Sequence, residues 1–169
     1  MNFDPFFAWV EQSGFSVWLR ESPSLLAFPS VLVFHTIGMG FLAGTNLGMD
    51  LRILGIAKRI PLSSFEKFFP VMWYAFWLNL VSGFVLLIAY PTKALTNPVF
   101  YLKLTLIGLA LCDTRWLRNR VLRAVDEGSI SRNARVMAGI SLALWLGAIT
   151  AGRLLAYTYS RLQWDTPIR

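Results

Sequence analysis

The sequence contains one histidine, His35, which lies inside the apolar run SVLVFHTIGMGFLAGTNLG of residues 30–48. An ionisable side chain inside a membrane-spanning run is rare and usually faces the protein interior, so it is a functional hypothesis by default. A neutral imidazole can form a hydrogen bond to a neighbouring helix, or it can serve as an axial ligand of haem iron. From the sequence, both interpretations of His35 stay open.

Three further polar residues interrupt the other apolar runs: Asn79, Lys103 and Arg153. If each run is a membrane-spanning helix, a rise of about 1.5 Å per residue places His35 and Asn79 near the middle of the membrane. Lys103 and Arg153 then lie in its outer half, where a long side chain can also extend to the headgroups. With His35 and Asn79 they are the candidate cofactor-binding residues. If His35 ligates haem b, Arg153 and Lys103 are placed to contact its propionates.

The residue types that are present limit the chemistry of such a site. A second haem ligand would have to be a methionine, a water molecule or His35 of a symmetry-related copy, because the chain has one histidine. Its single cysteine, Cys112, excludes an intramolecular disulfide and a cysteine-based zinc or iron–sulfur site. No nucleophile–base pair, HExxH motif or glycine-rich phosphate loop occurs. We therefore predict no catalytic activity in the single chain.

The composition predicts an integral membrane protein. Hydrophobic residues make up 56% of the 169 residues and charged residues 15%, and the mean hydropathy is +0.54. Soluble domains have about a quarter charged residues, so this chain has too few polar groups to cover a water-facing surface. The formal net charge of +7 is assigned to cytoplasmic loops and anionic headgroups, and no nucleic-acid partner is expected.

Four apolar stretches are each close to the roughly 20 residues that a bilayer core requires. They cover residues 24–47, 68–89, 98–116 and 136–157. Asn97 and Pro98 are typical of the start of the third helix, and Ser131 is typical of the N-cap of the fourth. The predicted fold class is therefore all-α, an integral membrane four-helix bundle.

Aromatic and charged residues are mixed at the N-terminus, in FDPFFAWVEQSGFSVWLRES. This mixture predicts an interfacial amphipathic helix over residues 1–22, followed by one bundle over 23–158 and a short extracytoplasmic tail over 159–169. The first residues lack the basic region and cleavage site of a signal peptide, so we expect the first span to stay in the membrane.

Basic residues are concentrated in two of the loops between the spans. They are Arg52, Lys58, Arg59, Lys67, Arg118, Arg120, Arg123, Arg132 and Arg135. By the positive-inside rule these loops are cytoplasmic and both termini lie outside. Asp50 and Asp113, next to Arg52 and Arg115, are expected to form ion pairs across the helices at the cytoplasmic boundary.

Small residues recur every fourth position in two spans. The first stripe is Gly40, Gly44 and Gly48, and the second is Gly139, Ala143, Gly147 and Ala151. Such stripes let two helix backbones approach closely in lipid. We expect them to pack the first span against the fourth. The alternative is that one stripe is an interface with another membrane subunit or with a second copy of the chain.

The run FPSVLVFHTIGMGFLAGTNLGMDLRILG, with His35, Gly38, Gly44 and the sequence of residues 50–55, resembles an uncharacterised bacterial inner-membrane family of about four spans. The resemblance continues through TNPVFYLKLTLIGLA and AGRLLAY. It implies a bundle of about four spans in the bacterial inner membrane and no assigned activity. In that membrane the loop charges place both termini in the periplasm. More distantly, the first span is similar to copper-resistance D-type proteins and small b-haem bundles, which use further histidines that this chain lacks.

Three functions are compatible with these features. The first is a non-catalytic inner-membrane subunit, an anchor or assembly partner, for example in a respiratory or electron-transfer complex. The second is a b-type haem electron carrier that uses His35. The third is a small transporter, which requires polar residues through the whole membrane depth. The central region offers mainly His35 and Asn79 for that role.

Overall fold

The computed structural model describes residues 4–56, 58–124 and 130–162, and within them every regular element is a helix. The helices are α1 (Asp4–Glu11), α2 (Gly14–Glu21), α3 (Phe28–Leu54), α4 (Ser63–Glu66), α5 (Phe69–Ala89), α6 (Pro91–Leu95), α7 (Pro98–Ala124) and α8 (Arg132–Leu162). The predicted all-α class is therefore confirmed.

Three helices are long and apolar enough to span a membrane: α3, α5 and the part of α8 from Arg132 to Thr158. The fourth long helix, α7, is not among them. Its Lys103, Asp113 and Arg115 reduce its hydropathy.

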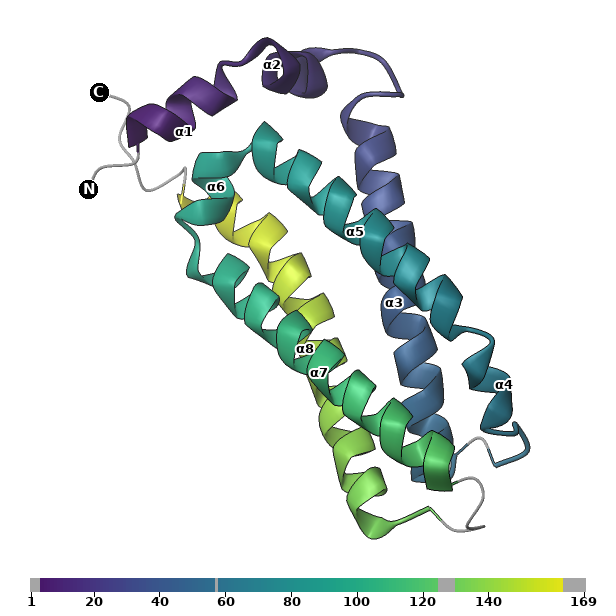
Figure 1. Ribbon diagram of the computed structural model, residues 1–169. Helices are drawn as coiled ribbons and strands as arrows, with labels where there is room; N and C mark the ends of the chain where they lie inside the picture. Colours follow the sequence, from purple (N-terminus) through teal and green to yellow (C-terminus); the bar gives the residue numbers. More distant parts are fainter. Residues whose placement is uncertain (1–3, 57, 125–129, 163–169) are drawn as a thin grey trace.

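The long helices pack as two pairs, α3 with α5 and α7 with α8, and contacts between α3 and α8 join the pairs. Figure 1 shows α1, α2 and α6 at one end of these helices and α4 at the opposite end. Residues that are far apart in the sequence, in α3 and α8, therefore share one interior.

Local capping sets several of the helix boundaries. The Val99 N–H donates to Asn97 Oδ1 over 2.9 Å at the start of α7, and the Ala134 N–H donates to Ser131 Oγ over 3.2 Å at the start of α8. Both predicted starts are confirmed. The helix α3 ends at Gly55, whose φ of 94° is left-handed and favours glycine.

The helices differ in length from the predicted spans. The first predicted span was 24–47, whereas α3 covers 28–54, and α7 and α8 also extend beyond 98–116 and 136–157. Hydropathy marks the apolar core of a helix, but the backbone stays helical through polar turns until a cap ends it. The predicted tail over 159–169 begins inside α8, and residues 163–169 lie outside the described part of the chain.

The predicted N-terminal helix over 1–22 is two short helices. The chain breaks at Ser13, whose Oγ accepts a hydrogen bond from the Ser16 N–H over 3.3 Å and so caps α2. The Arg20 guanidinium then donates to Ala89 O over 2.8 Å and to Glu11 O over 2.9 Å. These bonds satisfy a carbonyl at the C-terminus of α5 and connect α1, α2 and α5.

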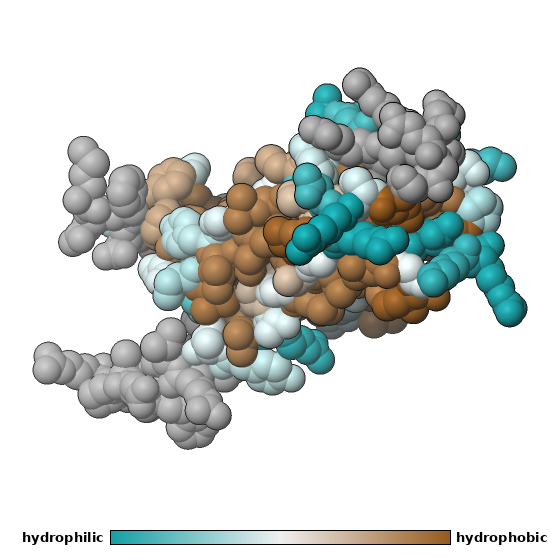
Figure 2. Space-filling model, turned by 90° about the horizontal axis from the view of Figure 1, so that it is seen from below, coloured by the Kyte–Doolittle hydropathy of each residue, from teal (hydrophilic) through white to brown (hydrophobic). Residues whose placement is uncertain are grey.

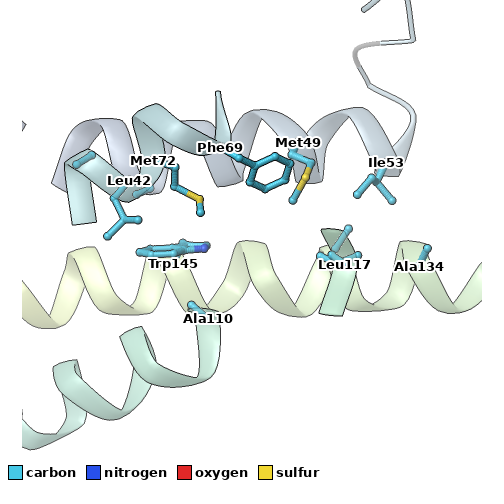
Figure 3. Packing of buried hydrophobic residues seen from close by; sticks show 12 residues of the cluster. Leu42, Met49, Ile53, Phe69, Met72, Ala110, Leu117, Ala134 and Trp145 are labelled. Atoms are coloured by element: carbon cyan, nitrogen blue, oxygen red, sulfur yellow. The ribbon is translucent and has the colours of Figure 1, made fainter. Parts of the chain in front are cut away.

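The hydrophobic core lies between the two helix pairs, and its largest member is Trp145 of α8, which is 0% exposed. In Figure 3 its ring lies below Leu42 and Met72, and the ring nitrogen is at the end of the indole that faces Leu117. The core therefore receives side chains from all four long helices.

The outer surface is also strongly apolar. Phe34, Trp77 and Phe84 are 52%, 58% and 62% exposed. Figure 2 views the molecule from below and shows apolar side chains over much of the surface, with hydrophilic ones gathered over part of it. The α4 end of the molecule carries exposed basic residues: Lys58, Arg59, Lys67, Arg132 and Arg135. The side chains of Arg120 and Arg123 lie outside the described part.

The two small-residue stripes do not pack α3 against α8 as predicted. Gly40 and Gly44 are exposed, and a Cβ atom added at either would meet no other atom within 4 Å. Gly139 is equally open, whereas Gly147 faces Leu106 of α7. α3 and α8 do contact each other, but through other residues, since the buried face of α3 carries Gly38, Leu42, Ala43, Asn46, Met49, Asp50 and Ile53.

Candidate functional site

His35 and Asn79 form a reciprocal connection between α3 and α5. The His35 Nδ1 atom lies 3.1 Å from Asn79 O and 3.1 Å from Ser82 Oγ, and Asn79 Nδ2 donates to His35 O over 2.7 Å. The Ser82 hydroxyl donates to Leu78 O over 2.6 Å, so Ser82 Oγ is an acceptor toward the imidazole. Because both partners of Nδ1 accept, Nδ1 carries the proton and Nε2 holds the lone pair.

Two glycines allow α3 and α5 to approach each other at this connection. A Cβ atom at Gly38 would lie 2.9 Å from Asn79 N and 3.0 Å from Ala75 O, both backbone atoms. A Cβ atom at Gly83 would lie 3.0 Å from Cε1 of His35. The imidazole therefore packs against a backbone without a side chain, which holds its ring in place.

Lys103 belongs to the same region, and Arg153 does not. The Lys103 ammonium is close enough to His35 to act on it electrostatically. Its side chain crosses α8 at Gly152, where an added Cβ atom would lie 3.8 Å from Nζ. The Arg153 side chain is exposed and lies over the Tyr157 ring, 5.9 Å from its centroid. The structure therefore brings His35, Asn79 and Lys103 together and leaves Arg153 on the outer surface.

A second polar cluster lies nearer the α4 end of the bundle. Asp50 of α3, Asp113 of α7 and Ser141 of α8 are 0%, 5% and 0% exposed. The Ser141 hydroxyl interacts with both carboxyl groups, and the two carboxyl groups act on each other electrostatically. Trp145, one helical turn after Ser141, borders the cluster.

The polar atoms of this cluster are not satisfied by the described residues. Both oxygens of Asp50, both oxygens of Asp113, Ser141 Oγ and Trp145 Nε1 are buried, and none has a hydrogen-bond partner there. Burial of an unpaired charge costs several kcal/mol. Buried polar groups are normally hydrogen-bonded, so four such side chains in one place require an explanation.

The predicted ion pairs at Asp50 and Asp113 are therefore wrong for the described residues. Arg52 instead donates to Ile60 O, Arg118 lies 4.6 Å over the Phe69 ring, and Arg115 is exposed. The sequence predicts the two acids at the cytoplasmic membrane boundary because both lie near the cytoplasmic ends of their predicted spans. The tertiary contacts turn the carboxyl groups inward and the guanidinium groups away.

A neighbouring network shows that polar groups in this interior can be fully satisfied. The Thr114 hydroxyl donates to Asn46 Oδ1 over 2.7 Å, and Asn46 Nδ2 donates to Leu42 O over 2.7 Å and lies 3.4 Å from Met72 Sδ. The sequence analysis did not single out Asn46, Thr114 or Ser141. A signal exists for two of them, because Asn46 and Asp50, and Ser141 and Trp145, are each one helical turn apart and share a face.

The described residues contain no group of three or more His, Cys, Asp or Glu residues that could hold a metal ion. They offer haem the His35 Nε2 atom as one ligand, and the Arg153 side chain lies over the Tyr157 ring. Comparison of the chain with protein-family models, curated proteins and solved structures finds no match. The resemblance to the four-span bacterial family therefore rests on the sequence motifs.

Proposed function

We propose that this chain is a non-catalytic integral membrane subunit that crosses the membrane four times and assembles with another membrane chain through α3. The observation that carries the proposal is the open face at Gly40 and Gly44. His35 and Asn79 support a structural role, because their polar groups connect α3 to α5 and leave no nucleophile or acid–base pair among them.

The packing of α7 supports a fourth span. The helix contains 27 residues, which corresponds to a length of about 40 Å, and it lies along α8, which is apolar enough to cross. Lys103, which reduces the hydropathy of α7, is half-buried against Gly152. A helix that is paired along its length with a spanning helix lies at the same depth.

Helices α1 and α2 support an interfacial location at the outer end. Phe6, Trp9 and Trp18 are exposed, while Arg20 connects both helices to the end of α5. Trp and Tyr side chains are enriched at the headgroup level, because their rings combine an apolar body with a polar N–H or O–H group. This arrangement is compatible with a periplasmic N-terminus in a bacterial inner membrane.

In this proposal, the Gly40–Gly44 face of one copy packs against the Gly40–Gly44 face of a second copy. Helices in lipid associate by close van der Waals packing, and a small-xxx-small face is the usual contact surface. Such a face is complementary to itself, so a two-fold symmetric pair satisfies both copies at once. In a larger assembly, for example an electron-transfer complex, the dimer is the unit that anchors the other subunits.

The test is the mass of the purified protein in mild detergent, measured by light scattering after gel filtration. We expect a dimer for the native chain and for Gly108→Leu, and a monomer for Gly44→Leu. Gly108 is the matched control, because it is also helical, exposed and open to an added Cβ atom. A monomeric native chain that binds no other subunit removes the basis of the proposal.

The second candidate function is haem binding, which the orientation of His35 supports. An absorption spectrum of the same purified protein distinguishes it from the structural role. The His35 Nδ1 atom is bonded to a carbonyl, which is how histidines that ligate metals through Nε2 are oriented. We expect a flat absorption spectrum after dithionite reduction. A Soret band that disappears in His35→Ala would assign the chain to the haem-binding electron carriers instead.

A further inference from the structure

The cluster of Asp50, Asp113, Ser141 and Trp145 has no role in the proposed assembly through α3. Gly40 and Gly44 are exposed, whereas all four cluster side chains are at most 5% exposed. The cluster therefore needs an explanation that holds whether the chain is a monomer or a dimer.

We propose that the Asp50 and Asp113 carboxylates and the Ser141 hydroxyl bind one small metal cation that prefers oxygen ligands, of the alkali or alkaline-earth class. Three helices each supply one ligand: α3, α7 and α8. The cation would neutralise buried negative charge and connect the α3–α5 pair to the α7–α8 pair.

The first support is the set of free lone pairs. Four carboxylate oxygens and one hydroxyl oxygen are buried without a hydrogen-bond partner among the described residues. Carboxylate and hydroxyl oxygens are hard ligands, which suit sodium, magnesium and calcium ions rather than the metals that prefer sulfur or imidazole.

The second support is Ser141, which is neutral and 0% exposed. Its Oγ atom lies close to both carboxyl groups, but no described pair of these atoms meets the geometry of a hydrogen bond. A proton on one carboxyl group forms a hydrogen bond to one acceptor at a time. A cation accepts lone pairs from several oxygens at once, so it explains the serine as well as the two acids.

No described cationic side chain can replace the metal. On α3, Arg52 is bonded to Ile60 O, and on α7, Arg118 lies over Phe69 while Arg115 is exposed. On α8, Arg135 is exposed, and α5 contains no charged residue. None of these described cationic side chains is a hydrogen-bond partner of either carboxyl group, so protonation is the alternative to a bound metal cation.

The test uses the full chain, purified in detergent, stripped with a chelator and exchanged into choline chloride. NaCl, MgCl₂ and CaCl₂ are then titrated separately at constant ionic strength, and thermal unfolding is followed by tryptophan fluorescence. We expect one of the salts to raise the Tm saturably, by about 5–10 °C at roughly 100 times its Kd. The midpoint moves to higher salt at acidic pH, because protons compete for the carboxylates.

Two variants locate the effect. Asp113→Asn is expected to abolish the salt-specific shift, and Glu66→Gln, which changes an exposed carboxylate on α4, is expected to keep it. If Asp113→Asn does not fold, the native chain still decides the question. Equal Tm values in all three salts and in choline chloride at every pH would overturn the site and leave a pair held by protons alone.

Discussion

At the scale of single residues, His35 illustrates how a rare side chain becomes part of a helix contact. Its Nδ1 atom binds Asn79 O and Ser82 Oγ, and its own carbonyl accepts the Asn79 amide. An isolated imidazole in lipid would be unfavourable, so the connection between α3 and α5 depends on partners that lie 44 and 47 residues away.

We predict that Asn79→Ala lowers the free energy of unfolding by about 1 kcal/mol, the usual size of an interhelical hydrogen bond in membranes. The Tm in detergent should fall by about 2–4 °C. Leu80→Ala is the control, because Leu80 is exposed on the same helix. Equal effects of the two substitutions would mean that the amide does not stabilise the helix pair.

At the scale of helices, the contact between α3 and α5 depends on one glycine that does not belong to the predicted stripe. Gly38 lies against the α5 backbone, whereas Gly40, two residues later, is open. A helix turns by 100° per residue, so neighbouring glycines can have opposite environments.

We predict that Gly38→Ala destabilises the protein by about 1–3 kcal/mol, because the new methyl group would overlap backbone atoms that cannot move aside. Gly108→Ala, at an exposed and open helical position outside the proposed dimer face, should cause no loss, since alanine is the better helix former by about 1 kcal/mol. Thermal unfolding of the two variants in the same detergent compares them directly. The reverse order would show that α3 presents a different face to α5.

At the scale of the whole molecule, the ends of the helices differ in kind. Aromatic α1 and α2 lie at one end, and α4 with the exposed Lys58, Arg59 and Lys67 belongs to the other. One end of the long helices is therefore aromatic and the other is basic. The positive-inside rule predicts that the basic end faces the cytoplasm.

We predict this orientation as a labelling pattern in cells. With Cys112 replaced by alanine, a membrane-impermeant maleimide should label Gln12→Cys from the periplasmic side. Ser63→Cys should react only in inverted vesicles, and the cysteine-free parent in neither preparation. Both positions are exposed. Labelling of both variants from one side would contradict this orientation, because a single span, α3, separates Gln12 from Ser63.

Several features could be read from the sequence because they depend on neighbouring residues. Apolar run lengths predict the long helices, and Asn97 and Ser131 predict two of their starts, which the hydrogen bonds at Val99 and Ala134 confirm. The division of the N-terminal segment at Ser13 was not predicted, although the cap that causes it is equally local. The orientation of the helices is predicted from the loop charges, and the labelling experiment tests it.

Which face of each helix is buried was decided only by the tertiary structure. In a soluble protein the polar face of a helix faces water, so the sequence shows that the opposite face packs against the core. Here the outer surface is as apolar as the interior, so hydropathy carries no such information, and Gly40 and Gly38 cannot be told apart. For the same reason the sequence did not show that the Asp50, Asp113 and Ser141 side chains point inward. Their inward orientation depends on how α3, α7 and α8 meet, and no neighbouring residue in the sequence specifies that geometry.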